Sequence, residues 1–299
     1  MFSFARSSRT VGEKAIEAFL LACGALSIFT TIGIILVLVV ESALFFENVS
    51  LSQFFFDTEW TPLFMEKHFG IWPLICGTVL TSVIALTLSV PAGLIIAIYL
   101  SEFASERSRK IIKPVLEILA GIPTIVYGYF ALLFITPLLQ LFLPALGSFN
   151  ALSAGLVMGI MVLPMVASLS EDAIYTVPQN LREGAYALGA SKLQMIFGGV
   201  LPAAIGGITA AFILAASRAV GETMIVAIAA GQQPLLHFNP LQPVETMTAY
   251  IVQVSLGDTP HGTIEYHTLF AVAMMLFLLT LTLNMASMAV RDRFKRMFR

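Results

Sequence analysis

Charge is scarce in this chain of 299 residues, since only 11% of them are charged against roughly one quarter in a soluble globular domain. Hydrophobic residues make up 58%, and the mean hydropathy is +0.90. These values exclude a soluble domain and indicate an integral membrane protein. The apolar runs are long and do not alternate over ten residues, which favours transmembrane helices over an outer-membrane barrel.

Reactive side chains are few as well. The chain has two cysteines, Cys23 and Cys76, in separate apolar segments, which argues against a disulfide or a metal site. It contains no His-Glu-x-x-His, no Gly-x-Ser-x-Gly and no Gly-x-x-x-x-Gly-Lys-Ser/Thr motif, so nothing in it predicts an intramembrane enzyme or an ATP site of its own. We expect all four histidines to lie in outer loops and to face solvent: His68, His237, His261 and His267.

Six apolar segments are long enough to cross a hydrocarbon core about 30 Å thick. They cover residues 18–40, 73–100, 114–141, 151–169, 204–230 and 268–290. Of the 16 Lys and Arg residues, 14 fall in segments that this arrangement places inside, one (Lys67) falls outside, and one (Arg218) lies within a span. The positive-inside bias therefore predicts a multi-pass protein of the plasma (inner) membrane with both termini in the cytoplasm.

These spans divide the chain into four parts. A cytoplasmic N-terminal segment (1–17) precedes the first transmembrane helix and an extracytoplasmic loop (18–72). A core of five transmembrane helices (73–290) contains a long inner loop at 170–203, and a basic cytoplasmic tail (291–299) ends the chain. The fold class is all-α.

Small residues and proline mark two features of the core. Gly121-Ile-Pro123 predicts a bend in the third span, because proline has no N–H to continue a helix. Ala151, Gly155 and Gly159 recur every four residues in the fourth span, a spacing typical of close helix packing.

The inner loop at 170–203 is too long to be a simple connection. Leu181, Ala185 and Leu188 recur at helical spacing, and Gly189 can end that helix in the left-handed conformation. Ser191 and Gln194 form a capping box for a second short helix. An interfacial segment resting on lipid would carry more cations than the two present, Arg182 and Lys192, so we expect a protein partner.

The fifth span carries two charges one helical turn apart, Arg218 and Glu222. They could compensate each other as a packing ion pair, or they could line a pathway for a charged solute. A guanidinium presents donors that match the oxygens of phosphate or carboxylate. Nearer the inner boundary, Glu117, Glu171 and Asp172 are expected to be cap or interface charges.

One motif resembles a known family. Glu183-Gly184-Ala185, followed by Gly189 and then Leu201-Pro202, is similar to the "EAA" motif of permeases of ATP-binding-cassette (ABC) importers, with Gly184 in place of an alanine. The resemblance implies the type I importer permease fold, in which this loop is a coupling helix seated in a groove of a cytoplasmic ATPase. It implies that Glu183, Gly184, Ala185, Gly189, Leu201 and Pro202 serve that contact.

A second motif narrows the resemblance. Arg218-Ala-Val-Gly-Glu-Thr-Met224 resembles the "Arg-Ala-x-Gly-Glu-Thr" signature of the two permeases of the high-affinity phosphate importer. Its Met-x-Val ending, Glu59-Trp60 and the 121–128 stretch resemble the PstC-type subunit. The resemblance implies that Arg218, Glu222 and Thr223 line the substrate pathway of a phosphate importer.

The same resemblance implies the partners. These are a sister permease (PstA-type), two copies of a cytoplasmic ATPase (PstB-type) and an extracytoplasmic phosphate-binding protein (PstS-type). ATP and Mg would be bound by the ATPase, so this chain would need no cofactor and would not itself be an enzyme. Nothing predicts a nucleic-acid partner.

Two alternatives stay open. Related permeases carry sulfate, molybdate and other solutes, and only the 218–223 signature separates them. A stand-alone secondary transporter could use Arg218, Glu222 and Glu117 as a proton relay. However, no internal repeat is evident, and the long inner loop would have no role.

Overall fold

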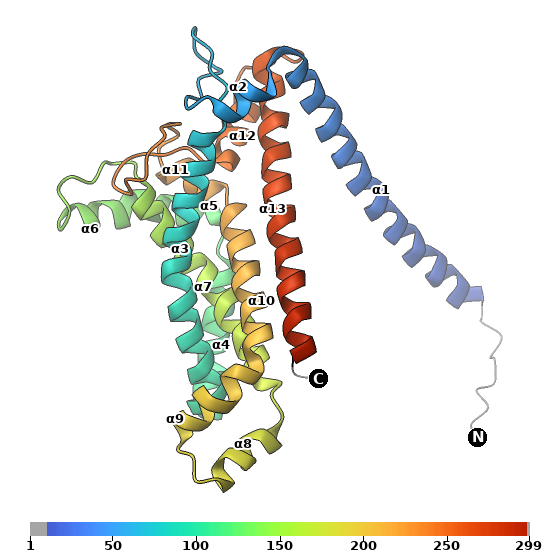
Figure 1. Cartoon of the computed structure of the whole chain (residues 1–299), viewed down its shortest axis with the longest axis vertical. Helices are drawn as coiled ribbons and strands as arrows, with labels where there is room; N and C mark the ends of the chain where they lie inside the picture. Colours follow the sequence, from blue (N-terminus) through green and yellow to red (C-terminus); the bar gives the residue numbers. More distant parts are fainter. Residues whose placement is uncertain (1–10, 298–299) are drawn as a thin grey trace.

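A computed structural model describes residues 11–297, and every regular element among them is helical. Five helices are long and apolar enough to cross a membrane. They are α1 (Val11–Asn48), α3 (Trp72–Ile98, extended by the π-helical turn η1, Tyr99–Phe103), α7 (Ala151–Tyr175), α10 (Leu201–Val220) and α13 (Ile264–Met297). Helices α3, α7, α10 and α13 form a bundle, whereas α1 leans away from it and contacts α13 (Figure 1).

The third predicted span is bent, as Gly121-Ile-Pro123 indicates. Helix α4 (Glu106–Gly121) ends there, and α5 (Thr124–Phe130), η2 (Ala131–Ile135) and α6 (Thr136–Gln140) continue at 89° to it. Ile122 and Pro123 are extended, which turns the chain without a helical hydrogen bond. The number of spans is six if this bent pair crosses as one, in agreement with the prediction.

The fifth predicted span is shorter than the sequence suggested. Helix α10 stops at Val220, and a separate short helix, α11 (Met224–Ala229), follows a break at 221–223. The prediction of one helix over 204–230 was therefore wrong at its outer end. The outer connection that follows contains a further helix, α12 (Met247–Leu256), which the sequence pattern did not indicate.

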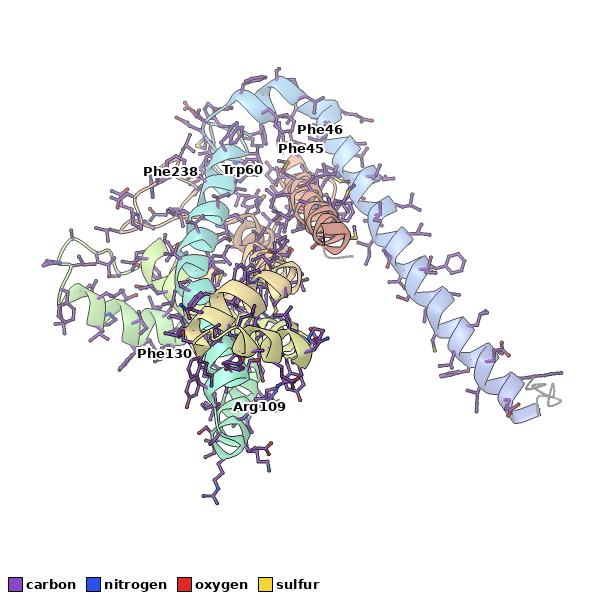
Figure 2. All side chains as sticks on the ribbon, turned by 60° about the horizontal axis from the view of Figure 1, so that its bottom comes forward. Phe45, Phe46, Trp60, Arg109, Phe130 and Phe238 are labelled. Atoms are coloured by element: carbon purple, nitrogen blue, oxygen red, sulfur yellow. The ribbon has the colours of Figure 1, made fainter. Side chains whose placement is uncertain are left out.

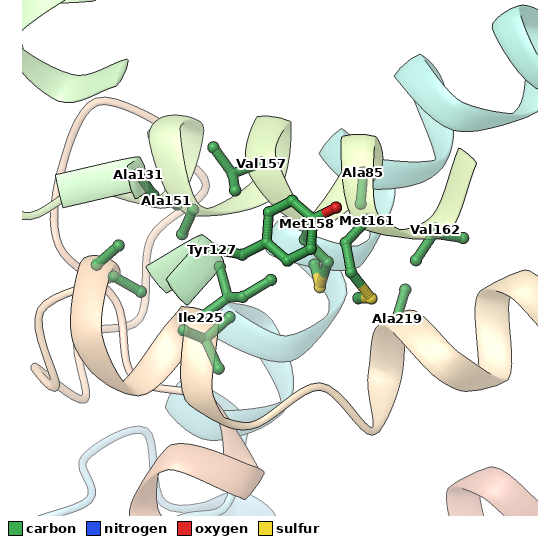
Figure 3. Packing of buried hydrophobic residues seen from close by; sticks show 14 of the residues in the cluster. Ala85, Tyr127, Ala131, Ala151, Val157, Met158, Met161, Val162, Ala219 and Ile225 are labelled. Atoms are coloured by element: carbon green, nitrogen blue, oxygen red, sulfur yellow. The ribbon is translucent and has the colours of Figure 1, made fainter. Parts of the chain in front are cut away.

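The small-residue stripe on α7 packs against α3, as predicted. A Cβ atom on Gly155 would lie 2.7 Å from the Ile84 side chain, and one on Gly159 would lie 2.9 Å from the Ala85 carbonyl oxygen. Hydrogen-only side chains let the two backbones approach this closely. The buried layer beside this contact is drawn in Figure 3, where Met158 and Met161 of α7 lie near Ala85.

The two ends of the bundle differ. One end, called here the far end, carries α2 (Leu51–Phe56) and α12. It has an aromatic cluster in which the Trp60 ring packs edge-on against the Tyr250 ring, with 5.1 Å between their centroids. Figure 2 shows Trp60 near Phe45 and Phe46. The opposite end, called the loop end, carries α8 (Gln179–Ala187), α9 (Lys192–Met195) and the π-helical turn η3 (Ile196–Val200) (Figure 1).

The histidines are only partly as expected. His261 is exposed, but His267 is buried, with its Nδ1 3.0 Å from Glu41 Oε2. His68 Nδ1 lies 2.9 Å from Asp57 Oδ2, and this hydrogen bond raises the pKa of the His68 ring. The expectation that all four face solvent was wrong for His267, which is buried at the start of α13 against Glu41 of α1, and His68 and His237 are half-buried. Of the predicted terminal segments, residues 1–10 and 298–299 lie outside the described residues.

Candidate functional site

A cavity of about 460 Å³ lies between α4, α7 and α10. Helix α4 contributes Lys113 and Glu117, α7 contributes Ser168 and Glu171, and α10 contributes Arg218. The rest of the lining is apolar: Leu116, Ala120, Met161, Pro164, Met165 and Leu169. Charged groups of both signs in a mostly apolar wall are typical of a site that binds a small polar or ionic ligand.

The cavity is elongated along α7. Its lining on that helix runs from Met161 to Glu171, which corresponds to about 15 Å of helix at 1.5 Å per residue. Arg218 belongs to the Met161 end, because its neighbour Ala219 packs beside Met161 and Val162 (Figure 3). Glu171 belongs to the other end, toward α8. One cation, Arg218, therefore lies at the Met161 end, called here the deep end of the cavity, and the remaining charged groups lie closer to the loop end.

Glu222 does not share a helical face with Arg218. The helix ends between them, and Glu222 Oε1 accepts hydrogen bonds from the backbone N–H groups of Met224 (3.1 Å) and Ile225 (3.3 Å). The buried carboxylate thus caps the start of α11, where unpaired N–H groups and the helix dipole favour a negative charge.

The expected arrangement of the two charges on one continuous helix is therefore corrected. Among residues 11–297, no ion pair joins Arg218 to Glu222. The Glu222 carbonyl oxygen instead accepts the Thr248 hydroxyl at 2.6 Å, and the Thr223 hydroxyl donates to the Gly221 carbonyl at 3.3 Å. Arg218 is exposed, and the charged side chains that line its cavity are Lys113, Glu117 and Glu171.

Glu171 is the centre of a charge cluster that the sequence pattern did not reveal. Its side chain is 1% exposed, its Oε1 lies 2.6 Å from Arg109 Nη2, and its Oε2 lies 2.9 Å from Lys113 Nζ. The Arg109 guanidinium also lies over the Tyr175 ring, 4.9 Å from its centroid. The signal in the sequence was the spacing of Arg109 and Lys113 by one helical turn, since such a pair can reach one carboxylate.

The two other acidic residues near the loop end differ from Glu171. Glu117 is exposed and lines the cavity, as well as a second hollow of about 410 Å³ along α4. Asp172 is also exposed but lines neither hollow. Glu171 is an interface charge, as expected, because it joins α7 to α4, and both Glu117 and Glu171 also belong to the cavity wall.

The inner loop has the predicted helix–turn–helix form. Gly189 follows α8 with φ at +79°, in the left-handed region, and Ser191 and Gln194 form the capping box that starts α9. Glu183, Gly184 and Gly189 are exposed, and Ala185 is half-buried. Leu201 and Pro202 form the first turn of α10 and connect the loop to the helix that carries Arg218.

Large apolar side chains on this loop are exposed. Leu188 is 91% exposed, and the other members of this set are Tyr175, Leu181, Tyr186, Leu193 and Phe197. A concentration of apolar side chains on a polar, solvent-exposed loop is typical of a protein contact surface.

Arg182, one of the two cations of this loop, is a largely buried anchor. Its guanidinium donates to Glu102 Oε1 at 2.8 Å and to the carbonyl oxygens of Ile174 (3.0 Å) and Val177 (2.5 Å). The two side chains are 11% and 6% exposed. The loop is therefore tied to both α7 and η1, and only Lys192 remains as an exposed cation on it.

Comparisons with known proteins agree with this architecture. Residues 89–299 match the family "Binding-protein-dependent transport system inner membrane component". Over 248 residues the chain is 34% identical to "Phosphate transport system permease protein PstC" of Xylella fastidiosa, covering 76% of this chain and 75% of that one. It is 30% identical to "Probable ABC transporter permease protein YqgH" of Bacillus subtilis, covering 92% and 89%.

A solved structure supports the fold. The bacterial alginate ABC transporter, in complex with an alginate pentasaccharide-bound periplasmic protein, contains a chain that superposes with a TM-score of 0.63 at 16% identity. The match covers 93% of this chain and 96% of that one. With its multiple apolar spans and these relatives, the chain belongs to the family of binding-protein-dependent transport system inner membrane components, the permease subunits of ABC importers, and is of the PstC type.

Proposed function

We propose that this chain is the permease subunit through which an ABC importer moves inorganic phosphate into the cytoplasm. The observation that carries the proposal is Arg218, a charged side chain of a transmembrane helix that lines a cavity and, among the described residues, has no ion pair with the carboxylate four residues later. A guanidinium without an ion pair is costly inside a membrane, so its presence at this cavity favours a role toward an anion. Relatives named as phosphate permeases add support for phosphate.

The proposal includes partners. A PstA-type permease would complete the pathway beside the cavity, and a PstS-type binding protein would deliver phosphate at the far end. Two PstB-type ATPases would bind ATP and Mg and contact the exposed face of α8 through Glu183, Gly184, Ala185 and Gly189. Both chain termini would then lie in the cytoplasm, on the same side as the loop end.

Coupling to ATP is needed on energetic grounds. A negative-inside potential opposes the entry of each negative charge by about 2.3 kcal/mol per 100 mV, so a passive pore could not concentrate phosphate. ATP binding would draw the ATPases together and move α8. Because α8 is tied to α7 and η1 through Arg182, that motion would reach the helices that line the cavity.

Glu222 and Thr223 take a different role in this proposal from Arg218. Glu222 holds the start of α11, and Thr223 lies in the break beside it, so they fix the chain that follows Arg218. A second candidate, transport of another oxyanion such as sulfate or molybdate, remains in the same class. This second candidate uses the same cavity, and it differs only in which anion binds to Arg218.

The test is ATP-driven uptake of labelled phosphate in proteoliposomes that contain both permeases and the ATPase, with the binding protein outside. We expect Arg218→Ala to lower the uptake rate about tenfold to hundredfold, because a charge-assisted hydrogen bond contributes about 1.5–3 kcal/mol. Arg107→Ala removes an exposed cation of α4 that lines neither hollow and should transport normally. Transport of phosphate without the ATPase, or normal uptake by Arg218→Ala, would refute the proposal, and uptake of sulfate in preference to phosphate would favour the second candidate.

A further inference from the structure

The charge cluster around Glu171 lies on the path from the cavity to the loop end. Lys113 lines both the cavity that holds Arg218 and the second hollow along α4. That second hollow is lined by α4 alone, with the cations Arg109, Lys110 and Lys113 and the carboxylates Glu106 and Glu117. Cations therefore follow one another from the deep end of the cavity toward the loop end.

The exposure of the three paired side chains is unequal. Arg109 and Lys113 are 32% and 34% exposed, whereas Glu171, which contacts both, is 1% exposed. The carboxylate is thus buried against the two cations at the cavity wall, whereas the cations are partly open, Lys113 to both hollows and Arg109 to the second hollow. An anion that moved from the cavity into the second hollow would meet Lys113, which lines both, and then Arg109.

The size of the hollow and the side chains of Arg109 and Lys113 suit an oxyanion. The second hollow, which Arg109 and Lys113 line together, has a volume of about 410 Å³, many times the roughly 30 Å³ that a water molecule occupies in the liquid, so a tetrahedral anion fits with part of its hydration shell. A guanidinium and an ammonium group one helical turn apart can share the oxygens of such an anion. They do so here with the oxygens of Glu171.

On the basis of the proposed phosphate pathway, we propose that Arg109 and Lys113 form a release-side anion subsite in which Glu171 competes with the transported oxyanion. Glu171 occupies both cations when the subsite is empty. When phosphate arrives, it shares them with a carboxylate that cannot leave. Phosphate is therefore held weakly and passes on to the cytoplasm, which conduction through successive sites requires.

Removal of the Glu171 charge should make this subsite bind phosphate more tightly and release it more slowly. The two cations would then be uncompensated, and phosphate from the cytoplasmic side should occupy them and slow transport. A purely structural ion pair between α4 and α7 predicts a loss of assembly and no change in sensitivity to phosphate. The two roles are thus separated by how strongly phosphate on the cytoplasmic side inhibits transport.

The experiment uses the assembled complex in proteoliposomes with the ATPase outward and with the binding protein and labelled phosphate in the lumen. ATP is added outside, and the initial rate of phosphate exit from the lumen is measured against external unlabelled phosphate. We expect Glu171→Gln to lower the half-inhibitory phosphate concentration at least tenfold. Asp172→Asn, which removes the adjacent exposed carboxylate, should stay within twofold of wild type.

A charge-balanced double variant tests whether the effect of Glu171→Gln comes from uncompensated positive charge or from misfolding. Glu171→Gln combined with Lys113→Gln should return the half-inhibitory concentration to near the wild-type value. If Glu171→Gln does not assemble, Lys113→Gln alone should raise that concentration at least threefold. The subsite proposal is overturned if an assembled, ATP-hydrolysing Glu171→Gln complex has the wild-type half-inhibitory concentration. It is also overturned if Lys113→Gln, used alone, has that wild-type concentration.

Two controls separate a failure of the subsite from a failure of the proposed function and from lipid binding. Absence of phosphate transport by the wild-type complex refutes the proposed function itself, whereas wild-type transport with no Glu171→Gln effect refutes only the subsite. The measurement is repeated in vesicles with and without phosphatidylglycerol. An effect that requires phosphatidylglycerol assigns Arg109 and Lys113 to a lipid headgroup and overturns the subsite, and an effect that persists without it supports the transported anion.

Discussion

Arg182 and Glu102 are 80 residues apart in the sequence, yet their side chains form a buried ion pair with 2.8 Å between Nη2 and Oε1. The same guanidinium donates to two backbone carbonyl oxygens at and just beyond the end of α7, Ile174 and Val177. One side chain thus joins α8 to two helices of the bundle. The Ile174 carbonyl oxygen also accepts the Val177 N–H at 3.2 Å, so Arg182 adds a second donor at the end of α7, where carbonyl groups lack their usual helical partners.

The first prediction concerns this anchor. Arg182→Ala leaves the Glu102 carboxylate buried without its cation, which typically costs about 3–5 kcal/mol when a buried pair is broken. We expect a lower thermal midpoint and faster proteolysis within residues 176–190. We also expect less phosphate to be transported for each ATP hydrolysed than in wild type. The measurement is the ratio of phosphate transported to ATP hydrolysed in the reconstituted complex.

The double variant Arg182→Ala/Glu102→Ala should be more stable than Arg182→Ala alone, because no unpaired charge remains. Lys192→Ala, an exposed loop cation that lies over the Phe103 ring at 4.4 Å, serves as the control. A single variant with normal stability and normal coupling would show that the anchor has no mechanical role.

Two glycines of the inner loop give opposite predictions. Gly189 has φ at +79°, so Gly189→Ala should destabilise the loop by about 1–2 kcal/mol. Gly184 lies inside α8, where an added Cβ has no atom of the described chain within 4 Å, so Gly184→Ala should stabilise α8 by up to about 1 kcal/mol. Hydrogen exchange of the α8 amides in the purified complex measures both effects, and equal protection in the two variants would contradict the expected conformations.

The contact between α3 and α7 makes a third prediction. Gly155→Val would press a branched side chain against Ile84 and the Thr81 carbonyl oxygen, 2.7 Å and 3.1 Å from the added Cβ. We expect a loss of about 1–3 kcal/mol, the usual cost of overpacking, seen as a lower thermal midpoint of the chain in detergent. Gly33→Val on α1 is the matched control, since no atom of the described residues lies within 4 Å of its added Cβ. Equal midpoints for the two variants would mean that α3 and α7 are not in close contact.

Glu245 at the far end makes the fourth prediction. Burial raises its pKa to about 8 from an ordinary value of 4.5, and its Oε1 has no hydrogen-bond partner among the described residues. The folded chain therefore holds a proton that the unfolded chain releases above pH 4.5. The stability that protonated Glu245 contributes is fully present below pH 4.5. As the pH rises from 4.5 to about 8, the free energy of unfolding falls by up to about 1.4 kcal/mol per pH unit.

Glu245→Gln removes this dependence. Its thermal midpoint should rise above that of wild type as the pH increases from 5 to 8, and the two should converge toward pH 4.5. Glu66→Gln, which removes an exposed carboxylate from the same end, is the control. A difference between Glu245→Gln and wild type that is constant with pH would show that Glu245 is charged in the folded protein at all of these values.

The sequence by itself determined the features that depend on local chemistry or on composition. Long uncharged runs require helices in lipid, because every backbone polar group must be satisfied within the segment. Pro123 enforces a bend, Gly189 accepts a left-handed turn, and Ser191 with Gln194 begins a helix, each through its own covalent structure. These predictions are confirmed because the cause lies within a few residues of the effect.

Only the tertiary structure decided which charges meet. The four-residue spacing of Arg218 and Glu222 suggested a pair, but Glu222 ends the helix by binding the N–H groups of α11, and Arg218 faces a cavity instead. Glu171 finds Arg109 and Lys113, and Arg182 finds Glu102, across distances in sequence that no local pattern records. A buried charge takes whichever partner the packing of helices brings within reach, so its partner is a property of the assembled bundle.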